Sequence, residues 1–456
     1  MTLRRWILKR NLQWQNKGVK NFMKQKKIFK TLLCTAVSAV LTAVLLTGCG
    51  GGGGGTGTGP NNPSNPSNPG SGPSSGKTDI TEKDNTTGVE WAYAKSSGNT
   101  VTLVGYSRTG QAPSGKVDVP SATKDGYKVT AIGAKALYQS KVASVTIPST
   151  VKTIGEGAFA ECTALRSVSI PNSVESIGAS AFYHSGLEQV VIPASVKQVG
   201  MAAFYNCTAL QSVAVNGAAV FDGSAYKGVF AGCKNLRTVN LSNEITRLGD
   251  GMFAECKSLE NINLPTKLVE IGNSAFSKCT SLANISLPKS LTKIGENAFA
   301  FCEKLEQITV PENVTVLQPY TFWYCKKLAK ATLPDKLTSI GKGTFAECSV
   351  LTDVNLPQNV NAIGENAFGG CRLLKKVILP EQLSKLEDYT FDRCEGLEKI
   401  YIPAKIRSIG DYALATNRPL NIYYGGTLDV WNRIPQQKIG LTSGTKVYCE
   451  ANPSQM

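Results

Sequence analysis

Cysteine and histidine are the side chains in this chain most able to do redox, metal or nucleophilic chemistry. The 456 residues contain thirteen cysteines but a single histidine, His184. No two cysteines form a C-x-x-C pair and no second histidine stands near them, so the donors of a zinc-type site are missing. Ten of the cysteines occupy one position of a repeated segment, each three residues after a phenylalanine: Cys162, Cys207, Cys233, Cys256, Cys279, Cys302, Cys325, Cys348, Cys371 and Cys394.

These ten cysteines are expected to form a buried ladder of thiols, because cysteine behaves as a small hydrophobe. Stacked Cβ atoms would point the same way, which fits disulfide geometry poorly. Bridges between neighbouring rungs are the alternative. Cys34 belongs to the predicted leader, and Cys449 has no evident partner.

Acid–base catalysis is poorly supplied. Carboxylates such as Glu161, Glu255 and Glu347 stand at variable positions and are expected to face solvent, and no Ser–His–Asp or paired-acid arrangement occurs. We therefore predict that the chain is not an enzyme and needs no cofactor.

The first 49 residues resemble the leader of a bacterial lipoprotein. Residues 24–30 hold four lysines and no acid, an apolar stretch follows from Thr31 to Leu46, and Leu46-Thr47-Gly48-Cys49 comes next. The resemblance to a lipobox implies cleavage before Cys49 and a lipid on its thiol, which would anchor the chain to a membrane. A transmembrane helix is the alternative, but the run of about 18 residues is near the lower limit for a span. Counted from Met1, the basic region would be unusually long for a signal peptide, which favours Met23 as the true start.

Removing the leader changes the charge argument. The net charge of +16 includes ten Lys/Arg and no acid in residues 1–48, so +6 remains for the mature chain. Such a weak charge spread over some 400 residues does not favour nucleic-acid binding. Residues 49–87 begin with a Gly/Pro/Ser/Asn segment that has no apolar side chain to bury, and they are predicted to be a disordered tether.

A repeat of 23 residues decides the fold. Each unit reads L-x-x-I-G-x-x-A-F-x-x-C-x-x-L-x-x-V-x-L-P, and from Gly249 to Gly410 the step is constant. One unit cannot bury its own apolar residues, so neighbours must stack into a solenoid. Thirteen units are counted by the phenylalanine-type position: Leu137, Phe159, Phe182, Phe204, Phe230, Phe253, Phe276, Phe299, Phe322, Phe345, Phe368, Phe391 and Leu414.

The elements within a unit follow from periodicity. V-x-L-P alternates and predicts a short strand that pairs in parallel with its neighbours. A-F-x-x-C-x-x-L has apolar residues at a spacing of three, which predicts a helix of one to two turns. The Ile-Gly pair is expected to supply a buried side chain and a flexible turn into that helix. The predicted architecture is an α/β solenoid.

The repeat resembles the leucine-rich repeat of the Treponema pallidum/BspA-like type over about residues 88–450. The resemblance implies a right-handed, curved array on a secreted or surface-bound protein, and members are described as adhesins for host matrix proteins or other bacteria. The strand-like alternation of residues 89–130 predicts a β-rich N-terminal cap at 88–130, followed by repeats at 131–424. The resemblance also implies a C-terminal cap and tail at 425–456.

Two surfaces are candidates for a partner. Phe301 and Tyr324 stand two residues after the repeat phenylalanine, where other units are mostly polar or small, and Tyr320 and Trp323 flank them. The outward strand positions become basic and aromatic toward the C-terminal end, at Lys330, Lys376, Lys399, Tyr401 and Tyr423. Local repacking of the outer face is the alternative for the first surface, and a solvated face with cap packing for the second.

The features together predict a lipid-anchored protein at the outer membrane or cell surface that binds a protein or a glycan. The partner could be host extracellular matrix or another bacterial surface. A structural scaffold inside the envelope, with no diffusible ligand, is the alternative. The long tether favours the surface location, because a scaffold needs less reach.

Overall fold

The computed structural model describes residues 77–107, 110–435 and 438–456, which all belong to one compact unit. The predicted leader, the predicted lipidation site Cys49 and most of the predicted tether lie outside the described residues. In the part that is described, no helix has the length and apolar character needed to cross a membrane.

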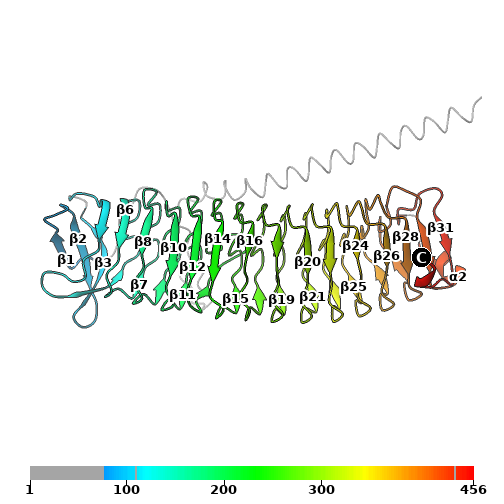
Figure 1. Ribbon diagram of the computed structural model, residues 1–456, viewed down its shortest axis with the longest axis horizontal. Coiled ribbons are helices and arrows are strands. Elements are labelled where there is room, and N and C mark those ends of the chain that lie inside the picture. The colour runs from blue at the N-terminus through cyan, green and yellow to red at the C-terminus, as the bar shows by residue number, and fades with distance from the viewer. Residues whose placement is uncertain (1–76, 108–109, 436–437) are drawn as a thin grey trace, which may run out of the picture. The chain divides into compact units, whose positions relative to one another are not determined.

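Each repeat contributes two strands, which lie in two rows of parallel strands along the array (Figure 1). The first row was missed by the sequence analysis, and its strands are mostly two residues long. The first row contains β5 (Lys128–Ile132), β7 (Thr153–Ile154), β9 (Ser176–Ile177), β11 (Gln198–Val199), β13 (Val220–Phe221), β15 (Arg247–Leu248), β17 (Glu270–Ile271), β19 (Lys293–Ile294), β21 (Val316–Leu317), β23 (Ser339–Ile340), β25 (Ala362–Ile363), β27 (Lys385–Leu386) and β29 (Ser408–Ile409).

The second row holds the predicted V-x-L strands, and its parallel pairing confirms that prediction. Where the step is 23 residues, equivalent residues are direct neighbours, as in the pair Lys376 and Lys399. The second row contains β4 (Ser114–Asp118), β6 (Lys141–Thr146), β8 (Ser167–Ser169), β10 (Gln189–Ile192), β12 (Ser212–Val215), β14 (Thr238–Leu241), β16 (Asn261–Ile262), β18 (Asn284–Ile285), β20 (Gln307–Thr309), β22 (Lys330–Thr332), β24 (Asp353–Val354), β26 (Lys376–Ile378), β28 (Lys399–Ile402), β30 (Asn421–Tyr424) and β31 (Lys446–Tyr448).

The chain is less regular at both ends of the array. At the start, β1 (Ile80–Lys83), β2 (Glu90–Lys95) and β3 (Thr100–Tyr106) pair antiparallel in that order. The predicted disordered tether therefore extends too far, because part of 77–87 is a paired strand. After β30 come a helix, α2 (Leu428–Arg433), strand β31, and a 3₁₀ turn, η1 (Pro453–Gln455).

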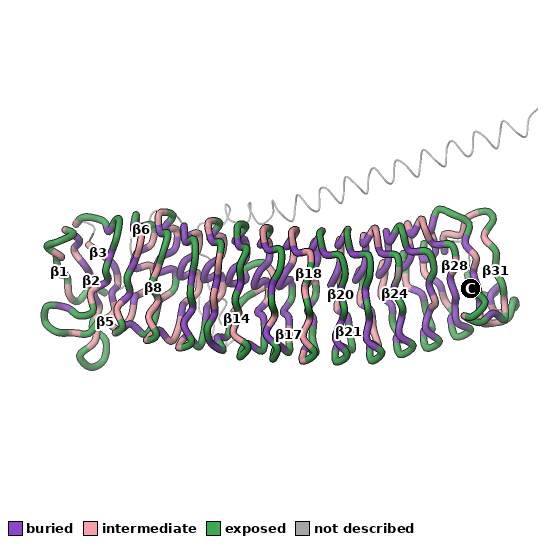
Figure 2. Tube along the Cα trace, in the orientation of Figure 1, coloured by how far each residue is buried: buried purple, intermediate pink, exposed green. Residues whose placement is uncertain are grey.

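The repeat phenylalanines form a continuous stack through the middle of the array. Eleven rings from Phe159 to Phe391 are buried, and neighbouring centroids lie 5.0–5.7 Å apart. Figure 2 shows buried residues recurring in every unit, with exposed residues at the turns between them. Offset-stacked aromatic pairs add about 0.5–1.5 kcal/mol each beyond the burial of their surface. The stack thus makes each repeat depend on its two neighbours.

The predicted helix in A-F-x-x-C-x-x-L is wrong, so the α/β description does not hold. The segment is a series of turns, because residues two before and two after the repeat phenylalanine often adopt a left-handed backbone. Asn297 and Phe301, which flank Phe299, have φ of 55° and 60°. Left-handed residues four apart cannot continue a right-handed helix. Their N–H groups instead donate to the next repeat, as from Phe301 to the carbonyl of Trp323 at 2.7 Å.

The buried thiol ladder is confirmed. All ten repeat cysteines are free and buried, and each thiol lies within hydrogen-bonding distance of the carbonyl oxygen of the residue at the phenylalanine position one unit earlier. The Cys279 Sγ, for example, lies 3.1 Å from the oxygen of Phe253. Cysteine at this position therefore fills the core and also satisfies a buried carbonyl group.

Candidate binding surface

The turns around the repeat phenylalanine form one continuous surface, which we call the turn face. It consists of the residues two before, one after and two after each repeat phenylalanine. The first and third of these positions carry positive φ in most units. Glycine and asparagine adopt positive φ at the lowest conformational energy. Gly251, Gly343, Asn297 and Asn366 follow that preference. Bulky side chains at these positions require another explanation.

Four aromatic side chains gather on the turn face across two neighbouring repeats, and we call them the aromatic patch. Phe301 meets Trp323 nearly edge-on at a centroid distance of 4.7 Å, and Tyr324 lies 4.9 Å from Phe301. Tyr320 lies 5.6 Å from Trp323. All four are half-buried, so each retains surface that solvent or a partner can reach. The structure therefore brings together the four residues that the sequence analysis selected.

The backbone of the aromatic patch is conformationally costly. Phe301, Tyr320 and Tyr324 have φ of 60°, 57° and 62°, where a side chain with a Cβ costs roughly 1–2 kcal/mol. In the next repeat, Gly343 fills the position equivalent to Tyr320. The Tyr320 ring lies over Gly343, since a Cβ built on that glycine would lie 2.5 Å from the ring. Other units adopt the same turn without aromatic residues, so the fold does not require them.

A cation already covers one ring of the patch. The Lys326 ammonium lies 4.4 Å from the centroid of Tyr324 and 3.2 Å from a carboxylate oxygen of Glu303. Partial burial lowers the pKa of Lys326, but the contacts with Glu303 and Tyr324 outweigh it and the net shift is upward. At this point of the turn face, the ammonium of Lys326 makes both a cation–π contact with the ring and an ion pair with the carboxylate.

The outward positions of the second row of strands form a surface that we call the strand face. Its basic and aromatic C-terminal end is less exposed than the sequence suggested. Tyr401 was expected to face outward, but it is only 4% exposed, and its hydroxyl bonds Glu381 at 2.7 Å. The chain at Gly425 closes over that hydroxyl, because a Cβ there would lie 2.8 Å from the hydroxyl oxygen. Tyr401 is therefore unavailable to a partner, and its predicted exposure is wrong.

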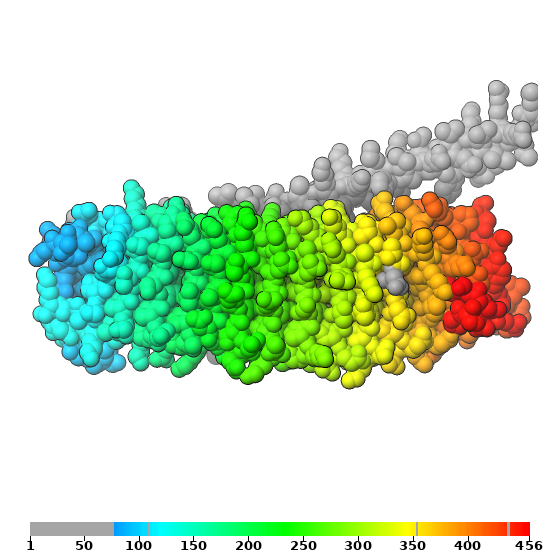
Figure 3. Space-filling model, in the orientation of Figure 1, coloured from blue at the N-terminus to red at the C-terminus, as the bar shows by residue number. Residues whose placement is uncertain are grey.

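The other predicted residues of the strand face remain at least partly exposed. Lys330 is exposed and Lys399 half-buried. Lys376 donates to the carbonyl oxygen of Met456 at 2.9 Å, and Tyr423 stacks on Tyr448 at 5.0 Å. The red C-terminal residues pack against the orange final repeats in Figure 3. The chain's own end thus occupies part of this face.

A second aromatic cluster was missed. Tyr183 and Tyr205 are half-buried, and their rings lie parallel at 5.6 Å. His184 packs on Tyr183 at 4.4 Å, and its Nε2 lies 3.0 Å from the amide nitrogen of Asn206. The sequence signal that could have revealed this cluster is a tyrosine directly after the repeat phenylalanine, at a position that is mostly alanine in other units. The single histidine is held by an aromatic ring and an amide rather than by a catalytic partner.

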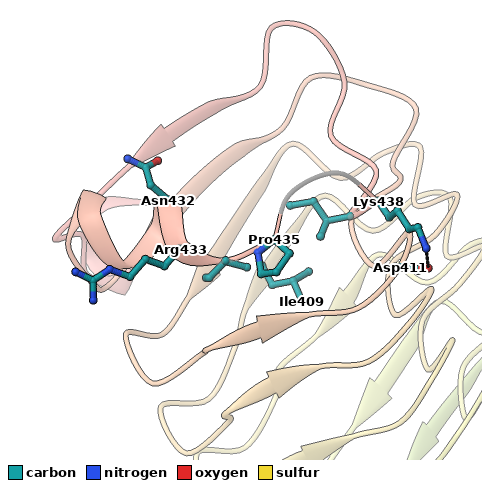
Figure 4. A pocket seen from close by; sticks show the side chains of 8 residues that line it. Ile409, Asp411, Asn432, Arg433, Pro435 and Lys438 are labelled. Carbon is teal, nitrogen blue, oxygen red and sulfur yellow. Dashed lines mark hydrogen bonds and ion pairs between the residues drawn. The ribbon is translucent and has the colours of Figure 1, made fainter.

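Among the described residues, no three His, Cys, Asp or Glu side chains lie close enough to hold a metal ion. A pocket beside α2 has Ile409 and Pro435 in its wall and Asn432, Arg433, Asp411 and Lys438 around it (Figure 4). Asp411 and Lys438 are paired across 3.3 Å, so their charges are already matched.

Comparisons with known proteins identify the repeat family and proteins of similar fold. A model of the BspA type leucine rich repeat region matches residues 130–228, 224–329 and 317–432. A leucine-rich repeat protein from Bacteroides ovatus is 25% identical, with a TM-score of 0.57 over 79% of this chain and 98% of that one. A leucine rich cell surface protein from Faecalibacterium prausnitzii is 27% identical, with a TM-score of 0.48 over 81% and 99%. The search of curated proteins finds no match.

Proposed function

The chain belongs to the BspA type leucine-rich repeat family, and from that premise we propose that it is an exported, lipid-anchored protein that binds a macromolecular partner at the cell surface. Cys49 carries the lipid, and the segment that follows it holds the repeats away from the membrane. Repeat arrays present long, rigid surfaces, which suit binding better than catalysis. The partner is a protein or a glycan of a host matrix or of another bacterium.

The aromatic patch carries this proposal. Phe301, Tyr320, Trp323 and Tyr324 form a half-buried cluster, with some surface still accessible, of side-chain types that are enriched at interfaces. Three of them stand at left-handed positions, and the neighbouring repeats fill these with other residue types: Asn297 and Gly343 at the position of Tyr320, and Lys278 and Glu347 at that of Phe301 and Tyr324. Strain that the fold does not need is an indication of function. Packing alone would be served more easily by the residues used elsewhere.

The experiment compares two variants of the full chain. The triple variant Phe301→Ala, Trp323→Ala and Tyr324→Ala should weaken binding to immobilised matrix proteins or bacterial cells more than tenfold, because central aromatic residues often contribute over 2 kcal/mol each. The control, Glu255→Ala with Lys278→Ala, removes a matched ion pair at the same position of two other repeats. Equal affinity of the triple variant and the control, with both folded, would remove the patch from the proposal.

A further inference from the structure

Two tyrosines form an exposed pair on the turn face toward the C-terminal end of the array. Tyr389 and Tyr412 are 39% and 48% exposed, and their rings lie nearly parallel with centroids 5.4 Å apart. Both stand two residues before the repeat phenylalanine position, like Tyr320 of the aromatic patch, and both have φ of 58°. The pair therefore repeats, at the same strained position, the feature that distinguishes the patch.

Carboxylates surround this pair, and one of them, Asp388, forms no ion pair among the described residues, although Lys385 lies near enough to interact with it electrostatically. Asp411 is paired with Lys438, and Asp392 with Arg393. Asp388 accepts the backbone N–H of Asp411 at 2.8 Å, and within the described residues no Lys or Arg forms an ion pair with it. Burial, Tyr412 and the carboxylates of Asp388, Asp411 and Asp392, in that order, raise the pKa of Tyr389. The rings thus lie in a negative environment that favours a cation.

The aromatic patch shows what completes such an arrangement. At Tyr324 the ring, the ammonium of Lys326 and the carboxylate of Glu303 are all supplied by this chain. At Tyr389 and Tyr412 the rings and the carboxylate are present, and among the described residues no Lys or Arg lies over either ring. An aromatic face beside an unpaired carboxylate attracts ammonium and guanidinium groups.

We propose that Tyr389, Tyr412 and Asp388 form a second site on the turn face, which takes a lysine or arginine side chain of a protein partner. The proposal rests on the proposed binding function and gives its partner a chemistry: a segment with an exposed basic residue. Tyr389 lies three repeats beyond Tyr320, or roughly 15 Å at the spacing of parallel strands. One partner domain can therefore contact the aromatic patch and this site together.

The test uses the full chain labelled with 3-fluorotyrosine and a short glycine peptide containing one arginine. Fluorine resonances of Tyr389 and Tyr412 are assigned with Tyr389→Phe and Tyr412→Phe. The peptide should shift both resonances in a saturable titration, and the same peptide with citrulline should not. Equal shifts with citrulline, or no shift at either ring with arginine, would overturn the proposal. A neutral oligosaccharide that shifts them while the arginine peptide does not would assign the rings to a glycan instead.

Charge variants sharpen the result. Asp388→Asn keeps an oxygen that can accept the Asp411 N–H, yet it should weaken binding of the arginine peptide roughly two- to fivefold, as expected for loss of an exposed ion pair. The control Asp335→Asn removes an exposed carboxylate elsewhere and should change nothing. An equal loss in both variants would mean diffuse attraction only, and would overturn the site.

A gain of binding provides the converse test. Lys326→Gln leaves Tyr324 and Glu303 without their cation, so the arginine peptide should now shift the Tyr324 resonance as well. The triple patch variant of the preceding subsection should leave the titration at Tyr389 and Tyr412 unchanged. The two proposals can therefore fail separately, because one is read from the natural partner and the other from the peptide.

Discussion

The guanidinium of Arg393 reaches Glu347 two repeats earlier, with Nη2 2.7 Å from Oε1, and so spans a complete unit of the array. Gly370 occupies the equivalent position in the unit between them. Its φ is 77°, and a Cβ built on it would lie 2.9 Å from the carboxyl carbon of Glu347. The missing side chain makes the room in which the ion pair forms.

Gly370→Ala should therefore destabilise the array by more than the backbone cost alone, which is about 1–2 kcal/mol. Gly115→Ala is the matched control, because Gly115 has a φ of 63° and nothing within 4 Å of the position of its Cβ. Urea unfolding of the two variants measures the difference. Equal losses would show that the contact with Glu347 contributes nothing.

Tyr412→Gly distinguishes function from packing. The ring is 48% exposed, so its removal loses little burial, while glycine relieves a φ of 58°. We expect Tyr412→Gly to be more stable than Tyr412→Ala by about 1 kcal/mol and no less stable than the parent chain. Loss of more than about 1 kcal/mol relative to the parent would support local repacking as the reason for the tyrosine.

The thiol ladder predicts selective labelling. Burial raises the pKa of the Cys207 thiol to about 12, with a smaller opposing effect from Ser185, and removes the thiol from reagents. Among the cysteines of the described residues, only the half-buried Cys449 should react with iodoacetamide in the native chain. Mass spectrometry of tryptic peptides reads this out, with Cys449→Ser as the control. Rapid native labelling of any repeat cysteine would contradict the ladder.

The same burial makes stability fall at alkaline pH. Burial raises the pKa of Cys162 to about 11 and that of Cys207 to about 12, above the ordinary value of 9.0 that the unfolded chain is expected to have. The unfolded chain therefore loses these protons first, and the free energy of unfolding decreases as pH rises from 9 through 11 to 12. Below pH 9 this contribution is complete.

Urea unfolding at pH 7.5, 9 and 10.5 checks the expected decrease. Cys207→Ala should make the decline shallower by removing one of the titrating groups. A free energy of unfolding that stays constant between pH 9 and 10.5 would mean that the thiols are already ionised or exposed in the native array.

Much of the fold could be predicted from the periodicity of apolar residues. The buried positions of Phe276 and Cys279, the V-x-L strand and its parallel pairing all depend on a 23-residue step that the chain repeats many times. Phe301 and Tyr324 were identified because their column is mostly polar or small in other units, and Tyr320 and Trp323 because they flank these two. Internal repetition supplies that comparison within a single sequence.

The turn could not be predicted, because apolar residues at a spacing of three fit a helix and a turn equally well. Left-handed backbone is signalled by glycine, yet Lys278, Glu255 and Phe301 adopt it here. Those residues are held in place by hydrogen bonds to the next repeat, which only the stacked structure supplies. The burial of Tyr401 was missed for a similar reason, since it depends on how the chain returns over the last strands at Gly425.

Exposure of the repeats at the cell surface is the most direct test of the proposed function. Intact cells are treated with protease, and the repeat domain is then detected beside an internal envelope protein as a control. Surface binding predicts that the repeats are lost while the control protein survives. Repeats that persist until the envelope is breached would contradict surface binding and would favour a scaffold inside the envelope.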